Sequence, residues 1–392
     1  MVITFICEVL GEENNGTTIA TMNVVRFLRS KGHEVHIVCP DKDKEGKEGY
    51  LVLPRIHFGI FDNYVAHNGV VLSSAHNFNK NKELLALIEK SDIVHFNFGS
   101  KLTLKSAKYA HKHGVPCTAS FHTQAENFTN HVYMMKLSFP NWLIYVVLNH
   151  RLFSQVDSIH YPTQFMRDIF RKHHKTDAKE YIISNGTQSI FHREEVAKPE
   201  ELKDKIVITS TGRYSNEKCQ DTLLKAMKYS RHADKIQIIL AGEGPMKNRL
   251  EKKGKKYCKV PPILNFYSRE DLAKILNYTD LYCHCSYADL EAISCLEAIS
   301  VGITPILSDS KLSAVSSFAV DKNNVYRHGS ARELAKRIDY WIDHPEERKE
   351  NASKYLGAGE KYDLNRMMER MEAMFLETIE EYKAKHKGDE AK

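Results

Sequence analysis

This chain of 392 residues lacks several features of extracellular, metal-binding and membrane-spanning proteins. Its eight cysteines include no Cys-x-x-Cys pair, so no structural zinc site is indicated. Cys283 and Cys285 are the closest pair, and strand alternation predicts that both are buried free thiols in a reducing cytosol. No apolar run is long enough to cross a bilayer; the longest candidate is "WLIYVVL", residues 142–148. We therefore expect a cytoplasmic protein with no membrane span.

A large excess of one charge sign is also lacking. Lysine and arginine number 56 against 50 acids, a net charge of +6. This balance permits an anionic partner but does not indicate nucleic acid, and we expect no nucleic-acid partner. Hydrophobic residues make up 42% of the chain and charged residues 27%, as in ordinary globular proteins. The length exceeds that of one typical core, which predicts two domains.

Short β-branched runs alternate with helical patterns along both halves of the chain, and this alternation predicts parallel sheets covered by helices. The predicted strands are "VITFIC", "EVHIVC", "DIVHFNF", "PCTASFH", "SIHYPT" and "YIISNG" in the first half, then "IVITSTG", "IQIILAGEG", "ILNFYS", "LYCHCS" and "TPILS". The predicted fold class is α/β, with two doubly wound, Rossmann-like domains facing across a cleft. The domains are expected at 1–195 and 196–364, joined by a charged connection at 191–205. A helical end, about 365–392, is expected to pack back onto the first domain.

The five letters LEAIS occur twice, and each copy carries one glutamate, Glu291 or Glu297. A helix is predicted from Glu291 or Ala292 to Gly302, and a six-residue offset rotates a helical side chain by roughly 240°. The two acids therefore cannot share a face. On this pattern alone, Glu291 is an acid near a helix N-terminus and Glu297 is a solvated helical acid.

Four motifs in order resemble the retaining GT-B glycosyltransferases, the group often called family four. They are "YIISNGTQSIF", "TSTGRYSNEKCQDTLLKAM", "LAGEGPMKNRLEK" and the second LEA, which contains Glu297. Counting back by the family's spacing places Asp289 at the first acidic position, where the family has glutamate. The shorter aspartate puts the expected contact with the donor sugar hydroxyls in question, and Glu291 is able to substitute in part.

The resemblance implies a set of site residues. A carboxylate at Glu297 accepts both hydroxyls of a ribose, while Arg213 and Lys218 hold the departing diphosphate. The catalytic candidates are His122, Arg213, Lys218 and Asp289. The donor-binding candidates are Gly16, Arg213, Lys218, Gly242, Glu243, Glu291, Ala292, Ile293 and Glu297, and the acceptor-side candidates are Glu126 and Asn127.

The implied reaction transfers a hexose from a nucleoside diphosphate sugar, UDP-glucose in the first instance, with retention at the anomeric carbon. No Asp-x-Asp motif lies in a suitable loop, because "DKD" at 41–43 reads as a solvated turn. We therefore expect no metal and no cofactor beyond the sugar nucleotide. No carboxylate is placed as a nucleophile, which favours displacement on one face of the sugar.

The first half gives one indication of the acceptor. Phe139, Trp142 and Tyr145 stand in a segment with basic residues and a single nearby acid, and Lys105, Lys108 and Lys112 precede it. Such a composition suits the inner surface of an anionic membrane. The resemblance around "FHTQAENFTNH" is to bacterial enzymes that glucosylate diacylglycerol, so a lipid acceptor is expected. The alternatives are a buried helix here, a transferase with a soluble acceptor, a GT-B epimerase, a phosphorylase-like enzyme and a non-catalytic sugar-nucleotide binder.

Overall fold

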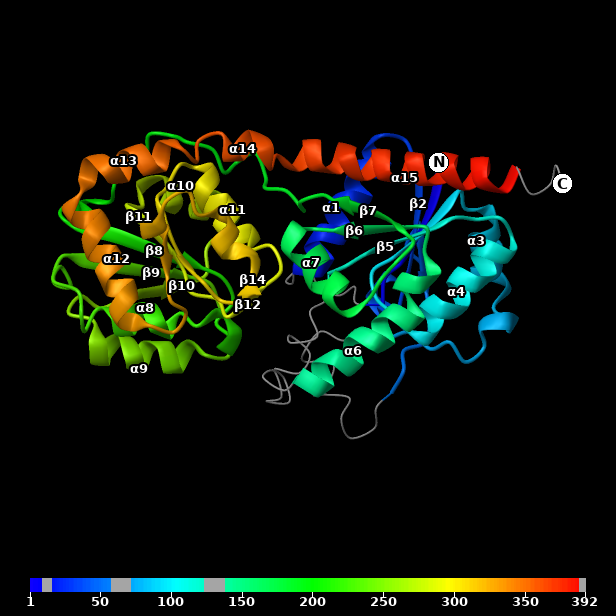
Figure 1. Ribbon diagram of the computed structural model, residues 1–392, viewed down its shortest axis with the longest axis horizontal. Coiled ribbons are helices and arrows are strands. Elements are labelled where there is room, and N and C mark those ends of the chain that lie inside the picture. Colours follow the sequence, from blue (N-terminus) through cyan, green and yellow to red (C-terminus); the bar gives the residue numbers. More distant parts are fainter. Residues whose placement is uncertain (9–15, 58–71, 123–137, 388–392) are drawn as a thin grey trace. The chain divides into compact units, whose positions relative to one another are not determined.

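The computed structural model describes residues 1–8, 16–57, 72–122 and 138–387. The chain forms two compact units (Figure 1). Unit 1 comprises residues 1–185 and 365–392, and unit 2 comprises residues 186–364. The division falls after Asn185, earlier than the boundary expected at residue 195.

Unit 1 contains a seven-stranded parallel sheet in the order β3-β2-β1-β4-β5-β6-β7. Its strands are β1 (Val2–Ile6), β2 (Glu34–Cys39), β3 (Tyr50–Val52), β4 (Ile93–Phe96), β5 (Cys117–Ser120), β6 (Ser158–Tyr161) and β7 (Lys179–Ile182). Its helices are α1 (Gly16–Ser30), α3 (Lys82–Lys90), α4 (Lys101–Lys112), α6 (Ser138–Arg151), α7 (Gln164–His173) and α15 (Leu364–Lys387), whose first residue belongs to unit 2. The central strands are apolar on both faces because helices cover both, as in other parallel sheets.

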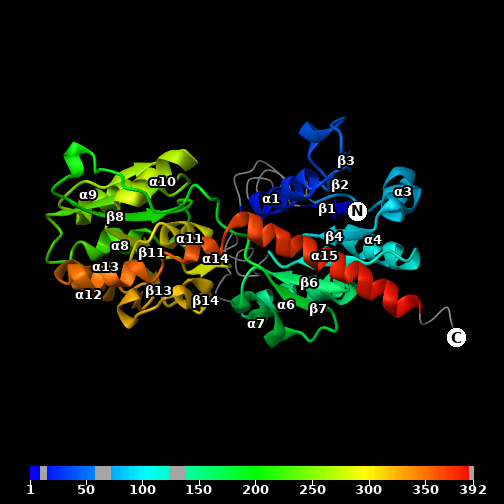
Figure 2. The ribbon, with the colours of Figure 1, turned by 90° about the horizontal axis from the view of Figure 1, so that it is seen from above.

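Helix α15 returns from the end of the chain to cover the sheet of unit 1 (Figure 2). The Phe375 ring lies edge-on to Phe5 of β1 and His95 of β4, with centroid separations of 6.1 and 5.3 Å. Farther along the helix, the Thr378 hydroxyl forms a 2.8 Å hydrogen bond with Ser158 Oγ at the start of β6. A helix from the chain terminus thus completes the core of the first unit.

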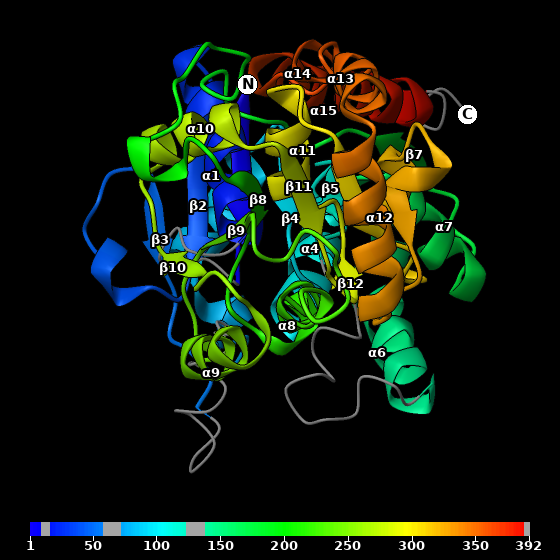
Figure 3. The same cartoon turned by 90° about the vertical axis from the view of Figure 1, so that its left-hand side faces the viewer.

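Unit 2 contains a six-stranded parallel sheet in the order β10-β9-β8-β11-β13-β15. Its strands are β8 (Ile206–Thr211), β9 (Ile236–Ala241), β10 (Ile263–Asn265), β11 (Leu281–His284), β13 (Pro305–Ser308) and β15 (Val325–Tyr326), beside a short pair, β12 (Ala288–Asp289) and β14 (Leu312–Ser313). Its helices are α8 (Asp221–Ala226), α9 (Lys247–Tyr257), α10 (Arg269–Tyr278), α11 (Ile293–Ser300), α12 (Ala331–Asp343), α13 (Pro345–Ser353) and α14 (Ala358–Lys361). In Figure 3, α8 and α9 lie below the sheet and α10 and α11 above it. Separate hydrophobic clusters match these two layers.

The predicted pair of Rossmann-like sheets is confirmed, as are the buried thiols of Cys283 and Cys285. Residues 191–205 were expected to connect the two domains, but the structure places this segment within unit 2. Phe191 is 2% exposed in the core beneath α11, and the Asn277 side chain bonds the backbone of His192 and Glu194. The buried Phe191 ring and the hydrogen bonds from the Asn277 side chain therefore fix a segment that has no apolar stripe.

The packing of α15 predicts a sharp contrast between two neighbouring residues. Phe375 is fully buried, whereas Leu376 is 42% exposed. Phe375→Ala should lower the free energy of unfolding by about 3–5 kcal/mol, because it leaves a cavity between the helix and the sheet. Leu376→Ala should change it by less than about 1 kcal/mol. Denaturant unfolding of both variants checks this, and equal losses would contradict the docking of α15.

Candidate functional site

The loops that follow β8 and β9 pack directly on each other in unit 2. A Cβ on Gly242 would lie 2.1 Å from the Gly212 carbonyl oxygen, and one on Gly244 would lie 2.7 Å from the Tyr214 carbonyl oxygen. Tyr214 N–H also donates to Glu243 O at 2.8 Å. Close packing of backbones therefore requires glycine at 242 and 244. Glu243 itself is exposed.

Arg213 and Lys218 lie on the β8 loop in different settings. Arg213 is exposed, and its guanidinium has no hydrogen-bond or ion-pair partner among the described residues. Lys218 ends a short 3₁₀ turn, Asn216–Lys218, and its side chain is 21% exposed. The loop therefore presents one free cation and one that is already paired.

Lys218 is paired with Asp289, which follows β11. Its Nζ donates to Asp289 Oδ2 at 2.6 Å, and His284 Nε2 lies 3.0 Å from the same oxygen. Burial opposes ionisation of Asp289, but the charge of Lys218 and the bond to His284 outweigh it and hold the pKa of the carboxyl well below its usual value. For His284, in contrast, burial lowers the pKa, and the hydrogen bond to Asp289 opposes this effect. The sequence missed His284, although its place at the end of β11 was a usable signal.

Two strained residues adjoin this ion pair. Cys219, directly after Lys218, has φ 49°, and Ala292, the N-cap of α11, has φ 57°. They are the non-glycine residues with positive φ in the described part of the chain. Such conformations cost about 1–2 kcal/mol. Ala292 N–H donates to Asp289 Oδ1 at 3.0 Å, which ties the entrance of α11 to the pair.

Both glutamates of the doubled motif are buried. Glu291 is 3% exposed and Glu297 is 2% exposed, so the solvated acid expected at Glu297 from helical pattern is wrong. Glu297 Oε1 accepts a hydrogen bond from Arg269 Nη2 across to α10. Burial raises the pKa of Glu297, and Arg269 partly offsets this. No local motif indicated Arg269, because its partner lies on another helix. Ile293, the first residue of α11, is partly exposed.

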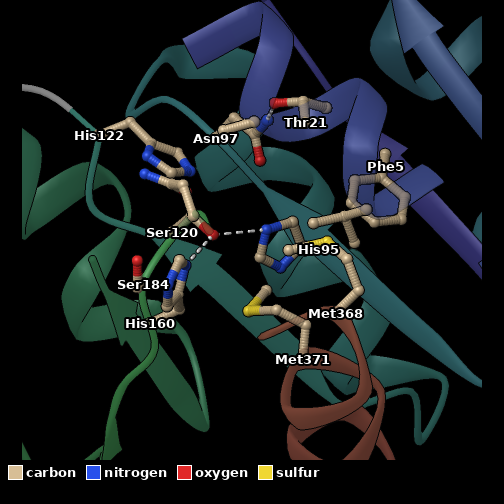
Figure 4. Close-up of a pocket in the computed structure, with 13 residues that line it drawn as sticks. Phe5, Thr21, His95, Asn97, Ser120, His122, His160, Ser184, Met368 and Met371 are labelled. Carbon is tan, nitrogen blue, oxygen red and sulfur yellow. Dashed lines mark hydrogen bonds between the residues drawn. The ribbon is translucent and has the colours of Figure 1, made fainter. Parts of the chain in front are cut away.

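In unit 1, His122 follows β5 and lies beside three other polar residues of the sheet (Figure 4). Its ring is edge-on to His160, with centroids 5.7 Å apart. His95 and Ser120 complete the cluster, around a cavity of about 10 Å³ that has room for one water molecule. Burial lowers the pKa of His122 to about 3 and of His160 to about 4, and lowers that of His95 well below its usual value.

A row of hydrogen bonds fixes the tautomers of His95 and His160. Ile183 O can only accept, so His160 Nε2, 2.6 Å away, must donate. Neutral His160 then accepts at Nδ1 from the Ser120 hydroxyl at 2.8 Å. Ser120 Oγ in turn accepts from His95 Nε2 at 2.9 Å, and His95 Nδ1 accepts from Thr118 Oγ1 at 2.8 Å. All four hydrogen bonds point in the same direction, from Thr118 to Ile183 O, and each neutral imidazole donates one bond and accepts one. The sequence had not indicated this arrangement.

Glu8 is a second buried titratable group that the sequence did not indicate. It follows β1, is fully buried, and accepts hydrogen bonds from Ser73 N–H at 3.2 Å and Thr103 Oγ1 at 3.3 Å. Burial raises its pKa to about 7. Gly16 begins α1, whereas the acceptor-side candidates Glu126 and Asn127 lie outside the described residues.

Helix α6 exposes an apolar patch. Phe139, Trp142 and Leu143 are 68%, 45% and 46% exposed, and the two aromatic rings lie 6.0 Å apart. Tyr145 was expected beside them, but it is buried against Phe121 because the helix turns it inward. Lys105 also has an intramolecular role: it donates to Ala75 O at 3.1 Å.

Across the described ranges, no helix is both long and apolar enough to cross a membrane. Within those same ranges, no group of three or more histidine, cysteine or acidic side chains is arranged to hold a metal ion.

The histidine cluster predicts acid lability. The folded histidines keep pKa values below the ordinary value of about 6.5, so the unfolded chain binds more protons below that pH. The free energy of unfolding should therefore fall as pH drops from about 6.5 toward 4, by about 1.4 kcal/mol per pH unit for each neutral histidine. His160→Gln should flatten this slope by about one proton, measured by denaturant unfolding from pH 4 to 7. His76→Gln, at an exposed histidine, is the control. An unchanged slope in His160→Gln would contradict the cluster's neutrality.

Comparison with known proteins agrees with this architecture. Residues 14–188 match the model "Glycosyltransferase Family 4", and residues 191–355 match "Glycosyl transferases group 1". The alpha-monoglucosyldiacylglycerol synthase of Streptococcus pneumoniae is 24% identical over 74% of this chain and 67% of its own length. That of Acholeplasma laidlawii is 22% identical over 85% of this chain and 86% of its own length.

Among solved structures, Anabaena Alr3699/HepE in complex with UDP-glucose superposes with a TM-score of 0.69. It is 15% identical, over 96% of this chain and all of that one. This similarity supports the fold. The resemblance drawn from the four motifs is confirmed: this chain is a glycosyltransferase of the GT-B fold, built from a Family 4 domain and a group 1 domain, and is homologous to the alpha-monoglucosyldiacylglycerol synthases.

Proposed function

We propose that the enzyme transfers glucose from UDP-glucose, with retention of anomeric configuration, to the hydroxyl of a membrane lipid such as diacylglycerol. The exposed apolar patch on α6 carries the lipid part of this proposal, because adjoining exposed side chains such as Phe139 and Trp142 mark contact surfaces, including membrane contacts. The names of the two curated relatives and the UDP-glucose complex of the Anabaena protein support it.

On the donor side, unit 2 supplies cations for the leaving diphosphate. Arg213 is free to make a two-pronged contact with phosphate oxygens. Lys218 has one bond to Asp289, and its ammonium group has further N–H donors for an anion. Glu297 is assigned to the ribose hydroxyls. The backbone N–H of Ile293, a partly exposed residue at the start of α11, is assigned as an additional donor.

We assign Asp289 to holding Lys218, and not to contacting the sugar. Its Oδ2 already accepts from Lys218 and His284, and its Oδ1 accepts from Ala292 N–H. A shorter side chain than glutamate suits this withdrawn position. None of these carboxylates serves as a nucleophile. The oxygen of the departing phosphate gains negative charge as its bond to the sugar breaks, and it receives the proton of the acceptor hydroxyl. This arrangement corresponds to displacement on one face of the sugar.

On the acceptor side, His122 of unit 1 is neutral at physiological pH. A neutral imidazole can donate or accept one hydrogen bond to a sugar hydroxyl without adding charge. Glu126 and Asn127 remain acceptor-side candidates. Membrane contact is proposed through Phe139, Trp142 and Leu143 at the N-terminal end of α6.

The identity of the reaction is tested with radiolabelled UDP-glucose and dispersed diacylglycerol. A glucolipid with the α-configuration by NMR is expected. A β-linked product would overturn retention, and equal transfer to soluble acceptors would overturn the lipid assignment. Incubation with the donor alone distinguishes an epimerase, which would convert it.

The cation assignment predicts the effect of Arg213→Ala. Turnover should fall about a hundredfold, because one fixed donor to a developing oxyanion contributes about 3 kcal/mol. Stability should be unchanged, since Arg213 is exposed. Lys218→Ala should lose turnover to at least the same extent and also lower the melting temperature, because it leaves Asp289 without its cation. Arg327→Ala, at an exposed ion pair of the same unit, is the control. Normal turnover in Arg213→Ala would refute its role.

The membrane assignment predicts selective loss of vesicle binding. The protein should co-sediment with anionic phospholipid vesicles at low salt and less at high salt, because charge attraction is screened over about 10 Å. Phe139→Ser with Trp142→Ser should reduce binding about tenfold or more. Phe266→Ser is the matched control, since Phe266 is also 68% exposed but lies in unit 2. Lys108→Glu with Lys112→Glu tests the charge contribution without disturbing Lys105. Protein that stays in the supernatant at low salt would contradict the proposal.

A further inference from the structure

The Glu297 carboxylate is almost fully withdrawn from water. Its side chain is 3% exposed on α11, and its Oε1 accepts from Nη2 of Arg269. Burying a carboxylate costs several kcal/mol unless a cation and hydrogen bonds compensate for it. The Arg269 pair is therefore the interaction that makes a charged group tolerable at this position.

Arg269 is itself held in place from a different part of unit 2. It is the first residue of α10, and its guanidinium carbon lies 4.6 Å from the centre of the Phe191 ring. Its Nε donates to Gln188 Oε1 at 3.3 Å. The planar group is thus fixed by a ring and an amide, with one nitrogen directed at Glu297. The remaining surface of the side chain, 45% exposed, faces solvent.

The surroundings of Glu297 supply little other charge. Tyr282 on β11 is buried and neutral, because burial raises the pKa of its hydroxyl well above the usual value. On α11 itself, burial likewise keeps Cys295 neutral by raising its pKa. Arg193 lies at the opposite end of the helix, where its Nη1 contacts Val301 O at 3.5 Å.

The other elements that pack on α11 do not change this picture. α14 carries Glu360 and Lys361, both exposed. β13, Pro305–Ser308, carries no titratable side chain, and His284 on β11 is bound to Asp289. Arg269 is thus the cation in direct contact with Glu297 within the described chain.

We propose that Arg269 is a positioning residue of the donor site, which keeps Glu297 ionised so that its carboxylate accepts hydrogen bonds from the ribose hydroxyls of a nucleoside diphosphate. This inference rests on the donor role proposed for Glu297. Only the ionised carboxyl is an acceptor at both oxygens; a protonated one would use one oxygen as a donor. Burial raises the pKa of Glu297 and Arg269 opposes that rise, so removing the arginine should shift ionisation to higher pH.

The test is calorimetric titration with free UDP from pH 6 to 9, with each variant expressed as a ratio to the unmodified enzyme. The ratio cancels the titration of the UDP phosphate and of groups common to both proteins. Arg269→Gln should weaken binding about tenfold at pH 6, the value of about one charge-assisted hydrogen bond, and recover as pH rises. Arg269→Lys keeps the positive charge, so its affinity for UDP relative to the unmodified enzyme should not change with pH. Arg327→Gln is the control at a solvent-exposed ion pair.

Loss of affinity by the same factor at every pH would overturn the proposal, because it would mean direct contact or damage to the fold. Undiminished binding in Arg269→Gln would overturn it as well. Glu297→Gln separates this from failure of the donor assignment, since undiminished UDP binding in that variant would refute the ribose role. The carboxyl carbon of Glu297, followed by ¹³C NMR in the enzyme without UDP, reports its ionisation directly. A titration midpoint that is unchanged in Arg269→Gln would refute control by Arg269 whatever UDP does.

Discussion

The ion pair of Lys218 and Asp289 is the contact on which the local structure of unit 2 depends. It joins the loop after β8 to the loop after β11, with side chains only 21% and 12% exposed. Removing one partner of such a pair leaves an uncompensated charge, at a cost of about 3–5 kcal/mol. The left-handed conformations of Cys219 and Ala292 stand on either side of the pair. Strain of this kind persists only where its surroundings hold it, and here the Asp289 carboxylate binds the Ala292 N–H directly.

The two units solve the problem of buried polar groups in different ways. Unit 2 uses opposite charges, as in the pairs of Asp289 with Lys218 and of Glu297 with Arg269. Unit 1 uses neutral imidazoles, whose donors and acceptors are matched one to one from Thr118 to Ile183 O. A neutral chain needs no counterion, but it is sensitive to protonation. The pair of Asp289 and Lys218 keeps its charge at low pH, because the pKa of Asp289 is held well below its usual value, and this suits a region proposed to bind an anionic donor.

The contacts of Asp289 explain why an aspartate can stand at the first acidic position, where the family has glutamate. Asp289 satisfies three donors within unit 2, from Lys218, His284 and Ala292. Its short side chain sets the geometry of the cation and of the α11 entrance together. Glu291, the other acid of this segment, is buried. Asp289 therefore makes contacts within unit 2 that the spacing of the motif in the sequence does not reveal.

The sequence by itself determined the alternation of strands and helices, the two parallel sheets and the membership of the glycosyltransferase family. These follow from local periodicity and from motifs whose residues are close in the chain. Short elements were not predictable from the sequence, because β15 has two residues and β3 has three, too few to show a pattern. The burial of Phe191 was not predictable either, because the residues around it in the sequence form no apolar pattern.

Only the tertiary structure decided which polar groups meet. Arg269 and Glu297 lie on different helices, and His95, Ser120 and His160 lie on three adjacent strands. The burial of Tyr145 and exposure of Trp142 likewise depend on how α6 packs against its unit. Ionisation, tautomer and exposure are set by neighbours in space, and a linear sequence specifies those neighbours only through the completed fold.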